Sequence, residues 1–126
     1  MGAVAGPSIV VQMLTAMEHD LQFRLNYKMD TSMMLSMQSI FLGTQKSSIL
    51  QRMSQLDPKS AEYKKLVEVE LVKIEVQERK MQAFEKQLEM QIKKLESQLK
   101  QVQQRKEGAQ KMLDQNIKGA FSYGQG

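Results

Sequence analysis

Few side chains in this sequence have the type and the spacing that catalysis or metal binding requires. His19 is the single histidine, and it stands between Glu18 and Asp20. The positions that would share its face of a helix, 15, 16, 22 and 23, hold Thr, Ala, Gln and Phe. They supply neither a further metal ligand nor an acid–base partner. We therefore interpret His19 as a surface or interface histidine.

The methionines are the second group that could do chemistry. The chain has 11 of them, and Met29, Met33 and Met37 lie four residues apart, with Met13 and Met17 before them. Thioether sulfur binds soft metals, but copper sites usually add Cys or His, and neither is near this series. Methionine also fills irregular apolar contacts, because its side chain is flexible and polarisable. We therefore interpret these residues as core or interface residues.

Other catalytic or cofactor-binding patterns are missing from the sequence. With no cysteine, the chain cannot form disulfides, thiolate metal sites or a Cys nucleophile. Glu68, Glu70, Glu75 and Glu78 lie in a stretch rich in Lys and Gln, with no glycine cluster to build a pocket around them. No glycine-rich phosphate loop, nucleophile elbow or HExxH motif is present. We expect no enzymatic activity, no metal and no cofactor.

The charge and hydropathy of the chain limit its partners. The net charge is +4, and the basic residues between 93 and 118 are interleaved with acidic ones, without an aromatic residue to stack on a base. This pattern is typical of a solvated helix face, so we do not expect nucleic-acid binding. No apolar run reaches the roughly 18 residues of a membrane span, and the start lacks the pattern of a cleaved signal. We expect a cytoplasmic protein or one exported by a signal-independent route.

The second half of the chain has the pattern of one long helix. We predict a turn at 57–59, with Asp57 as the helix cap and Pro58 at the first helical position. A charged coiled-coil helix is predicted over 60–118, because apolar residues follow three-and-four spacing from Tyr63, with one four-four step at Phe84, Leu88 and Ile92. Gly119 is predicted to end this helix, which leaves 119–126 as a tail.

The first half is apolar and rich in methionine. We predict a tail over 1–8 and a helical arm over 9–56 that is kinked near Gly43. Within the arm, residues 20–30 alternate strictly between apolar and polar, as in a half-buried strand. The preferred interpretation is nevertheless a helix, because the nearby segment 33–41 alternates poorly and would make a weak strand partner. A strand here would also need a partner for its unpaired edge.

As a helix, this arm is apolar on two sides. Leu21, Leu25, Met29 and Met33 share one side, whereas Phe23 and Tyr27 lie nearly opposite. The long helix can cover one side, and nothing else in the chain can cover the other. The residues that we predict at an interface are Leu21, Phe23, Leu25, Tyr27, Met29, Met33, Met37 and, in the tail, Phe121 and Tyr123.

The predicted fold is all-α: an elongated antiparallel helical hairpin or coiled coil. The predicted function is that of a non-enzymatic structural protein, a subunit that assembles into a homo-oligomer or filament. The alternative is an intracellular coiled-coil adaptor or chaperone, which would bind a client helix through the Met-rich arm.

Overall fold

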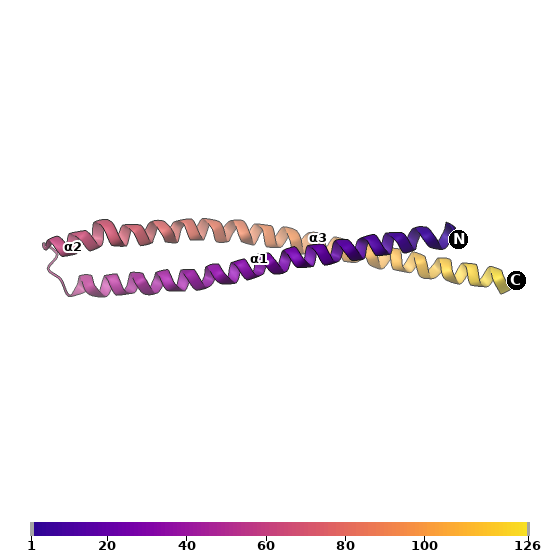
Figure 1. The fold of residues 1–126 in the computed structure, drawn as a ribbon, viewed down its shortest axis with the longest axis horizontal. Helices are drawn as coiled ribbons and strands as arrows, with labels where there is room; N and C mark the ends of the chain where they lie inside the picture. Colours follow the sequence, from indigo (N-terminus) through magenta and orange to yellow (C-terminus); the bar gives the residue numbers. More distant parts are fainter. Residues whose placement is uncertain (1, 126) are drawn as a thin grey trace. The chain divides into compact units, whose positions relative to one another are not determined.

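The computed structural model describes residues 2–125, and its secondary structure in that range is helical without strands. The elements are α1 (Gly2–Ser54), the short helix α2 (Ala61–Lys65), the π-helix η1 (Leu66–Leu71) and α3 (Val72–Gln125), as Figure 1 shows. The predicted all-α class is confirmed. Residues 20–30 lie within α1, so the strand interpretation of this segment is wrong.

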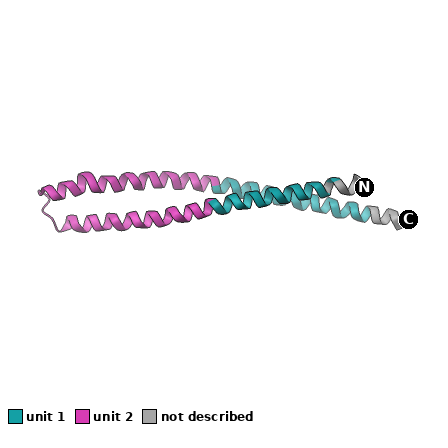
Figure 2. Ribbon diagram, in the orientation of Figure 1, with its two compact units in different colours: residues 1–27, 92–126 teal, residues 28–91 magenta. Residues whose placement is uncertain are grey.

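The chain divides into two compact units (Figure 2). Unit 1 consists of Met1–Tyr27 and Ile92–Gly126, and unit 2 consists of Lys28–Gln91. Each unit therefore contains a stretch of α1 and a stretch of α3, and unit 2 also contains the connection between the helices. Each has its own apolar core, as described below.

Unit 2 is hairpin-like, with the last part of α1 packed against the segment that begins at α2. Lys46 pairs with Glu78 at 3.4 Å, and Arg52 approaches Glu70 at 4.0 Å. Residue numbers rise along α1 while those of the partners fall, so the two helical stretches run antiparallel. A single short connection suffices to join antiparallel neighbours, and residues 55–60 supply it.

The connection is closed by local hydrogen bonds around Asp57 and Ser60. The Asp57 carboxylate accepts from the Lys59 amide at 3.0 Å, and the Asp57 carbonyl accepts from the Ser60 amide at 2.9 Å. Ser60 has extended backbone angles, and its hydroxyl accepts from the Tyr63 amide at 3.2 Å, so it caps α2. The predicted cap at Asp57 is therefore wrong: Asp57 and Pro58 form the turn itself.

The core of unit 2 is the cluster of Ile49, Leu66 and Ile74, with Met53 and Leu56 packed against it. Leu66 is the most buried of these residues, at 2% exposure. It precedes Ile74 by eight residues, one more than a heptad, and η1 begins at Leu66 itself. A π-helix has a wider turn that accommodates one extra residue, so Leu66 and Ile74 can face the same side of the helix.

Beyond η1, five covered positions of α3 in unit 2 follow three-and-four spacing. They are Ile74, Glu78, Met81, Glu85 and Leu88, each buried or half-buried, and Glu75 beside Ile74 is half-buried as well. Phe84 is 48% exposed, so the predicted four-four step through Phe84 is wrong. The helix instead presents Glu85 on its covered side. The spacing of the covered residues is thus more regular than the spacing of the apolar residues in the sequence.

Unit 1 has its own apolar core. Leu14 of α1 clusters with Val102 and Ala109 of α3, and Leu21 packs against them. Beside this cluster, Lys106 pairs with Glu18 at 3.6 Å. Contacts between α1 and α3 therefore define unit 1 just as they define unit 2.

Three predicted boundaries differ from the structure. Helix α1 begins at Gly2, not after a tail over 1–8. It passes through Gly43 without interruption, so the predicted kink is not confirmed. Helix α3 continues beyond Gly119 to Gln125. No glycine in the described chain adopts a positive φ, so neither Gly43 nor Gly119 provides the left-handed conformation that would end a helix.

Candidate functional site

The outer side of α1 in unit 2 carries a continuous exposed apolar surface, which we call the α1 ridge. Its members are Met33, Met34, Met37, Ile40 and Phe41, each between 61% and 70% exposed. They follow i, i+1, i+4, i+7, i+8 spacing, which places them on one face of the helix. Leu35 and Leu42, which are half-buried and buried, point to the other side. The ridge is thus the face of α1 that its own unit leaves uncovered.

The ridge is large for an exposed apolar surface. With about 200 Å² for each large side chain and roughly six-tenths of it exposed, the five residues present on the order of 600 Å². This is at the upper end for the largest apolar patch of a typical monomeric protein, about 300 to 600 Å². Residues 31–45 also contain no charged side chain that would keep a partner away. The ridge therefore has the size and the chemistry of a protein-binding surface.

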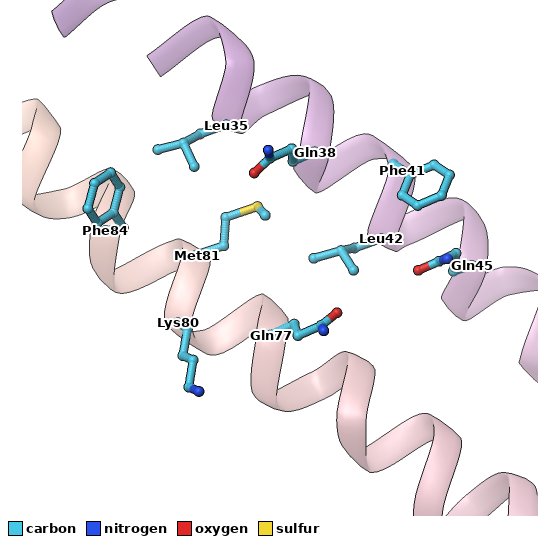
Figure 3. Close-up of a pocket in the computed structure, with 9 residues that line it drawn as sticks. All are labelled: Leu35, Gln38, Phe41, Leu42, Gln45, Gln77, Lys80, Met81 and Phe84. Atoms are coloured by element: carbon cyan, nitrogen blue, oxygen red, sulfur yellow. The ribbon is translucent and has the colours of Figure 1, made fainter. Parts of the chain in front are cut away.

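A second apolar surface, the flank groove, lies between α1 and α3 of the same unit. It is open to solvent, has a volume of about 670 Å³ and is lined by Leu35, Gln38, Phe41, Leu42, Gln45, Gln77, Lys80, Met81 and Phe84. Figure 3 shows Leu35 and Leu42 of α1 and Met81 of α3 directed into the space between the helices. Phe41 belongs to both surfaces, so the ridge and the groove adjoin each other.

The electrostatic surroundings of the two surfaces differ. Lys80 is the charged residue among those lining the groove. Asp30, which is exposed and lies one heptad before Met37, is the charged residue that precedes the ridge. The groove therefore has a cation at its edge, and the ridge has an anion at its amino-terminal end.

The residues predicted at an interface fall into three groups in the structure. Leu25 is buried and Leu21 is half-buried within unit 1, so their own chain covers them. The exposed residues are Phe23, Tyr27, Met29, Met33 and Met37. The side chains of Phe121 and Tyr123 lie outside the described ones. Of the predicted set, only Met33 and Met37 belong to the α1 ridge.

Met34, Ile40 and Phe41 complete the ridge and were not among the predicted interface residues. A signal for them is present in the sequence, because Met34, Met37 and Phe41 follow three-and-four spacing and residues 31–45 are uncharged. The predicted apolar side of the arm was defined by residues four apart, from Leu21 to Met33. The observed covered side of α1 is different, because Lys28 and Ser32 are half-buried on it.

Residues 2–125 contain neither a metal-binding group nor a membrane-spanning helix. No three or more His, Cys, Asp or Glu side chains come together in that range as metal ligands would. None of the helices over the same residues combines the length and the hydropathy of a membrane span. His19 is exposed on α1.

Comparisons with protein-family models, with curated proteins and with solved structures gave no match for this chain.

Proposed function

We propose that the chain is a non-enzymatic structural protein whose copies assemble through the α1 ridge. The observation that carries the proposal is the exposure of Met33, Met34, Met37, Ile40 and Phe41 together on one uncharged helix face. Water contact with such a surface is unfavourable, and burial gains about 25 cal/mol for each Å² removed. A second copy of the chain is a partner that is present wherever the chain itself is present.

The size of the ridge is compatible with this role. A specific interface of standard size buries about 800 Å² on each partner, and the smallest such interfaces bury about 600 Å². The ridge alone presents on the order of 600 Å². Its methionines can repack against an irregular surface, because their side chains are unbranched and flexible. A single contact of this size is therefore weak. An assembly that repeats the contact is more stable than an isolated dimer.

In this proposal the helices of each unit pair as a coiled coil, which gives the subunit a rigid support for the ridge. The three-and-four spacing of Ile74, Glu78, Met81, Glu85 and Leu88 supports this interpretation, because heptad spacing keeps one seam facing a partner helix. A ridge on a rigid helix loses little backbone conformational entropy when it binds.

Sedimentation velocity over a wide concentration range tests the proposal. We expect the purified chain to assemble, and the variant Met34→Gln/Met37→Gln to sediment as a monomer at the same concentrations. Glutamine resembles methionine in length and in helix propensity, so the helix should persist. Met90→Gln is the matched control, since Met90 is 71% exposed in the same unit and outside the ridge. A wild-type chain that stays monomeric at every concentration refutes the proposal, as does a ridge variant that assembles normally.

The flank groove favours a second candidate function, an adaptor that binds a client helix. A groove between two helices can hold the apolar face of a third. This candidate predicts a monomer that binds an amphipathic helical peptide, and it predicts that Phe84→Gln weakens that binding. Fluorescence anisotropy with a labelled peptide measures both effects.

A further inference from the structure

We infer that the ridge of one copy docks in the flank groove of the next, so that assembly is head-to-tail and grows into a ring or a filament. This inference rests on the proposed function, because it specifies how the copies meet. The ridge and the groove are different surfaces of one unit, and both are apolar. A contact between two different surfaces leaves one of each free on a dimer, which can then add further copies.

Shape favours a ridge–groove contact over a ridge–ridge contact. The ridge lies on a single helix, so a ridge–ridge contact joins one helix to one helix. The groove, by contrast, is lined by residues of both α1 and α3 (Figure 3), so a helix docked in it would contact both. The open volume of about 670 Å³ is within the range of about 300 to 1,000 Å³ typical of ligand-binding sites. Side chains of an incoming helix therefore have space to enter.

Burial favours the same arrangement. A ridge–ridge dimer would leave Phe84, which is 48% exposed, and the half-buried Met81 in contact with water. A ridge–groove contact covers these residues as well as the ridge, and it does so on every interior copy of a chain of subunits. Contacts between the methionine sulfurs of a docked ridge and the Phe84 ring of the groove would be favourable.

Charge gives a third argument. Lys80 lies at the groove, and the charged residue that precedes the ridge is Asp30. A docked ridge therefore brings an anion toward a cation, and residues 31–45 bring no cation that would repel Lys80. In a ridge–ridge contact Lys80 takes no part. Opposite charges at the edge of an interface speed association and exclude wrong orientations more than they raise affinity.

Two variants with complementary defects test the inference. Met34→Gln/Met37→Gln impairs the ridge and keeps the groove, whereas Phe84→Gln impairs the groove and keeps the ridge. Each side chain is about half exposed or more, so both variants should retain the helix content of the wild type, which circular dichroism checks. Met90→Gln again serves as the control that should assemble like the wild type.

The inference predicts three sedimentation results. Each variant alone should require at least a tenfold higher concentration than the wild type to assemble. An equimolar mixture should form a 1:1 dimer, because one intact ridge meets one intact groove. The mixture should not grow further, since the remaining ridge and groove are both defective.

Other outcomes overturn the inference in distinguishable ways. If Phe84→Gln assembles like the wild type, and the mixture adds no dimer, the contact joins ridge to ridge; self-assembly then stands and the head-to-tail arrangement fails. If neither variant associates in the mixture, the two surfaces are not complementary. A wild-type chain that is monomeric throughout refutes the proposed function together with this inference.

Discussion

Reversing the charges of Lys46 and Glu78 tests whether this ion pair helps to align α1 with α3 in unit 2. The two groups are 3.4 Å apart, and their side chains are 35% and 28% exposed. The Glu78 Oε1 atom is buried and has no hydrogen-bond partner among the described residues. The Lys46 ammonium therefore stabilises the buried negative charge of this carboxylate by electrostatic attraction. The two groups do not form a hydrogen bond.

The magnitude follows from distance and exposure. Two unit charges 3.4 Å apart attract by about 1.2 kcal/mol in water and about 5 kcal/mol at an effective dielectric constant of 20. Because about a third of each side chain meets solvent, we expect a net contribution of about 1 to 2 kcal/mol. Replacing Glu78 by Lys turns attraction into a similar repulsion. The free energy of unfolding should therefore fall by about 2 to 4 kcal/mol.

The reciprocal changes provide internal controls. Lys46→Glu alone should cost a similar amount, and the double variant Lys46→Glu/Glu78→Lys should recover to within about 1 kcal/mol of the wild type. The Asp20–Arg24 pair on α1 is the matched exposed pair, since its atoms are only 3.1 Å apart but its side chains are 56% and 63% exposed. Reversing Arg24 should cost less than about 1 kcal/mol, because exposed pairs four residues apart contribute about 0.2 to 0.5 kcal/mol.

Urea unfolding followed by far-ultraviolet circular dichroism measures these differences. The measurements are made in the Met34→Gln/Met37→Gln background, so that assembly does not contribute to stability. The reasoning is refuted if Glu78→Lys costs no more than Arg24→Glu, or if the double reversal is as unstable as the single ones. Either result would mean that the two charges do not interact across the helices.

Three further predictions concern the turn, the core and the interface. Ser60→Ala should lower the free energy of unfolding by about 1 kcal/mol in urea titrations, because the Tyr63 amide loses its hydrogen bond to the cap. Leu66→Ala should cost about 3 kcal/mol in the same assay, whereas Val69→Ala, at a 41% exposed position, should cost less than about 0.5 kcal/mol; equal losses would mean that Leu66 is not a core residue. Asp30→Lys should slow assembly measured by light scattering, and adding Lys80→Asp should restore the rate; failure of this rescue would remove the charge argument for docking.

The helical class could be predicted from the sequence because its signals are abundant and local. Glycine and proline are rare between Pro58 and Gly119, and residues of high helix propensity dominate there. The reversal near Asp57 was also predictable, since Pro cannot continue a helix that has already formed. The position of the cap was not, because Asp57 and Ser60 are both good caps and the Asp57 carboxylate is already used by the Lys59 amide.

The covered side of α1 could not be predicted from apolar spacing. The half-buried residues of α1 in unit 2 include Lys28, Ser32 and Lys46, which a search for apolar periodicity passes over. Apolar residues at steps of four, from Leu21 to Met33, form a clearer pattern in the sequence. This pattern does not follow the covered side of α1. Polar residues can occupy such positions because a long side chain keeps its charge near solvent or near an opposite charge, as Lys46 does with Glu78.

The presence of an exposed apolar surface could be predicted from the sequence, but its full set of residues could not. The excess of apolar residues in the first half indicated an uncovered helix side, and the α1 ridge is such a side. The flank groove was not predicted at all, because it depends on which residues of α1 and α3 face each other. That alignment is a property of the pair of helices, and no single segment encodes it.

The π-helix η1, which begins at Leu66, affects how this chain tolerates changes in length. Deleting one residue from η1 would place Leu66 one heptad before Ile74, so an ordinary α-helix could carry both on the same side. The segment thus behaves as the site of a single-residue insertion that the wider turn absorbs, without displacing the residues that follow. We expect the helix to accept a one-residue deletion in η1. The same deletion at Leu88, where α3 is an ordinary α-helix, should rotate the later residues of α3 away from the helix that they contact.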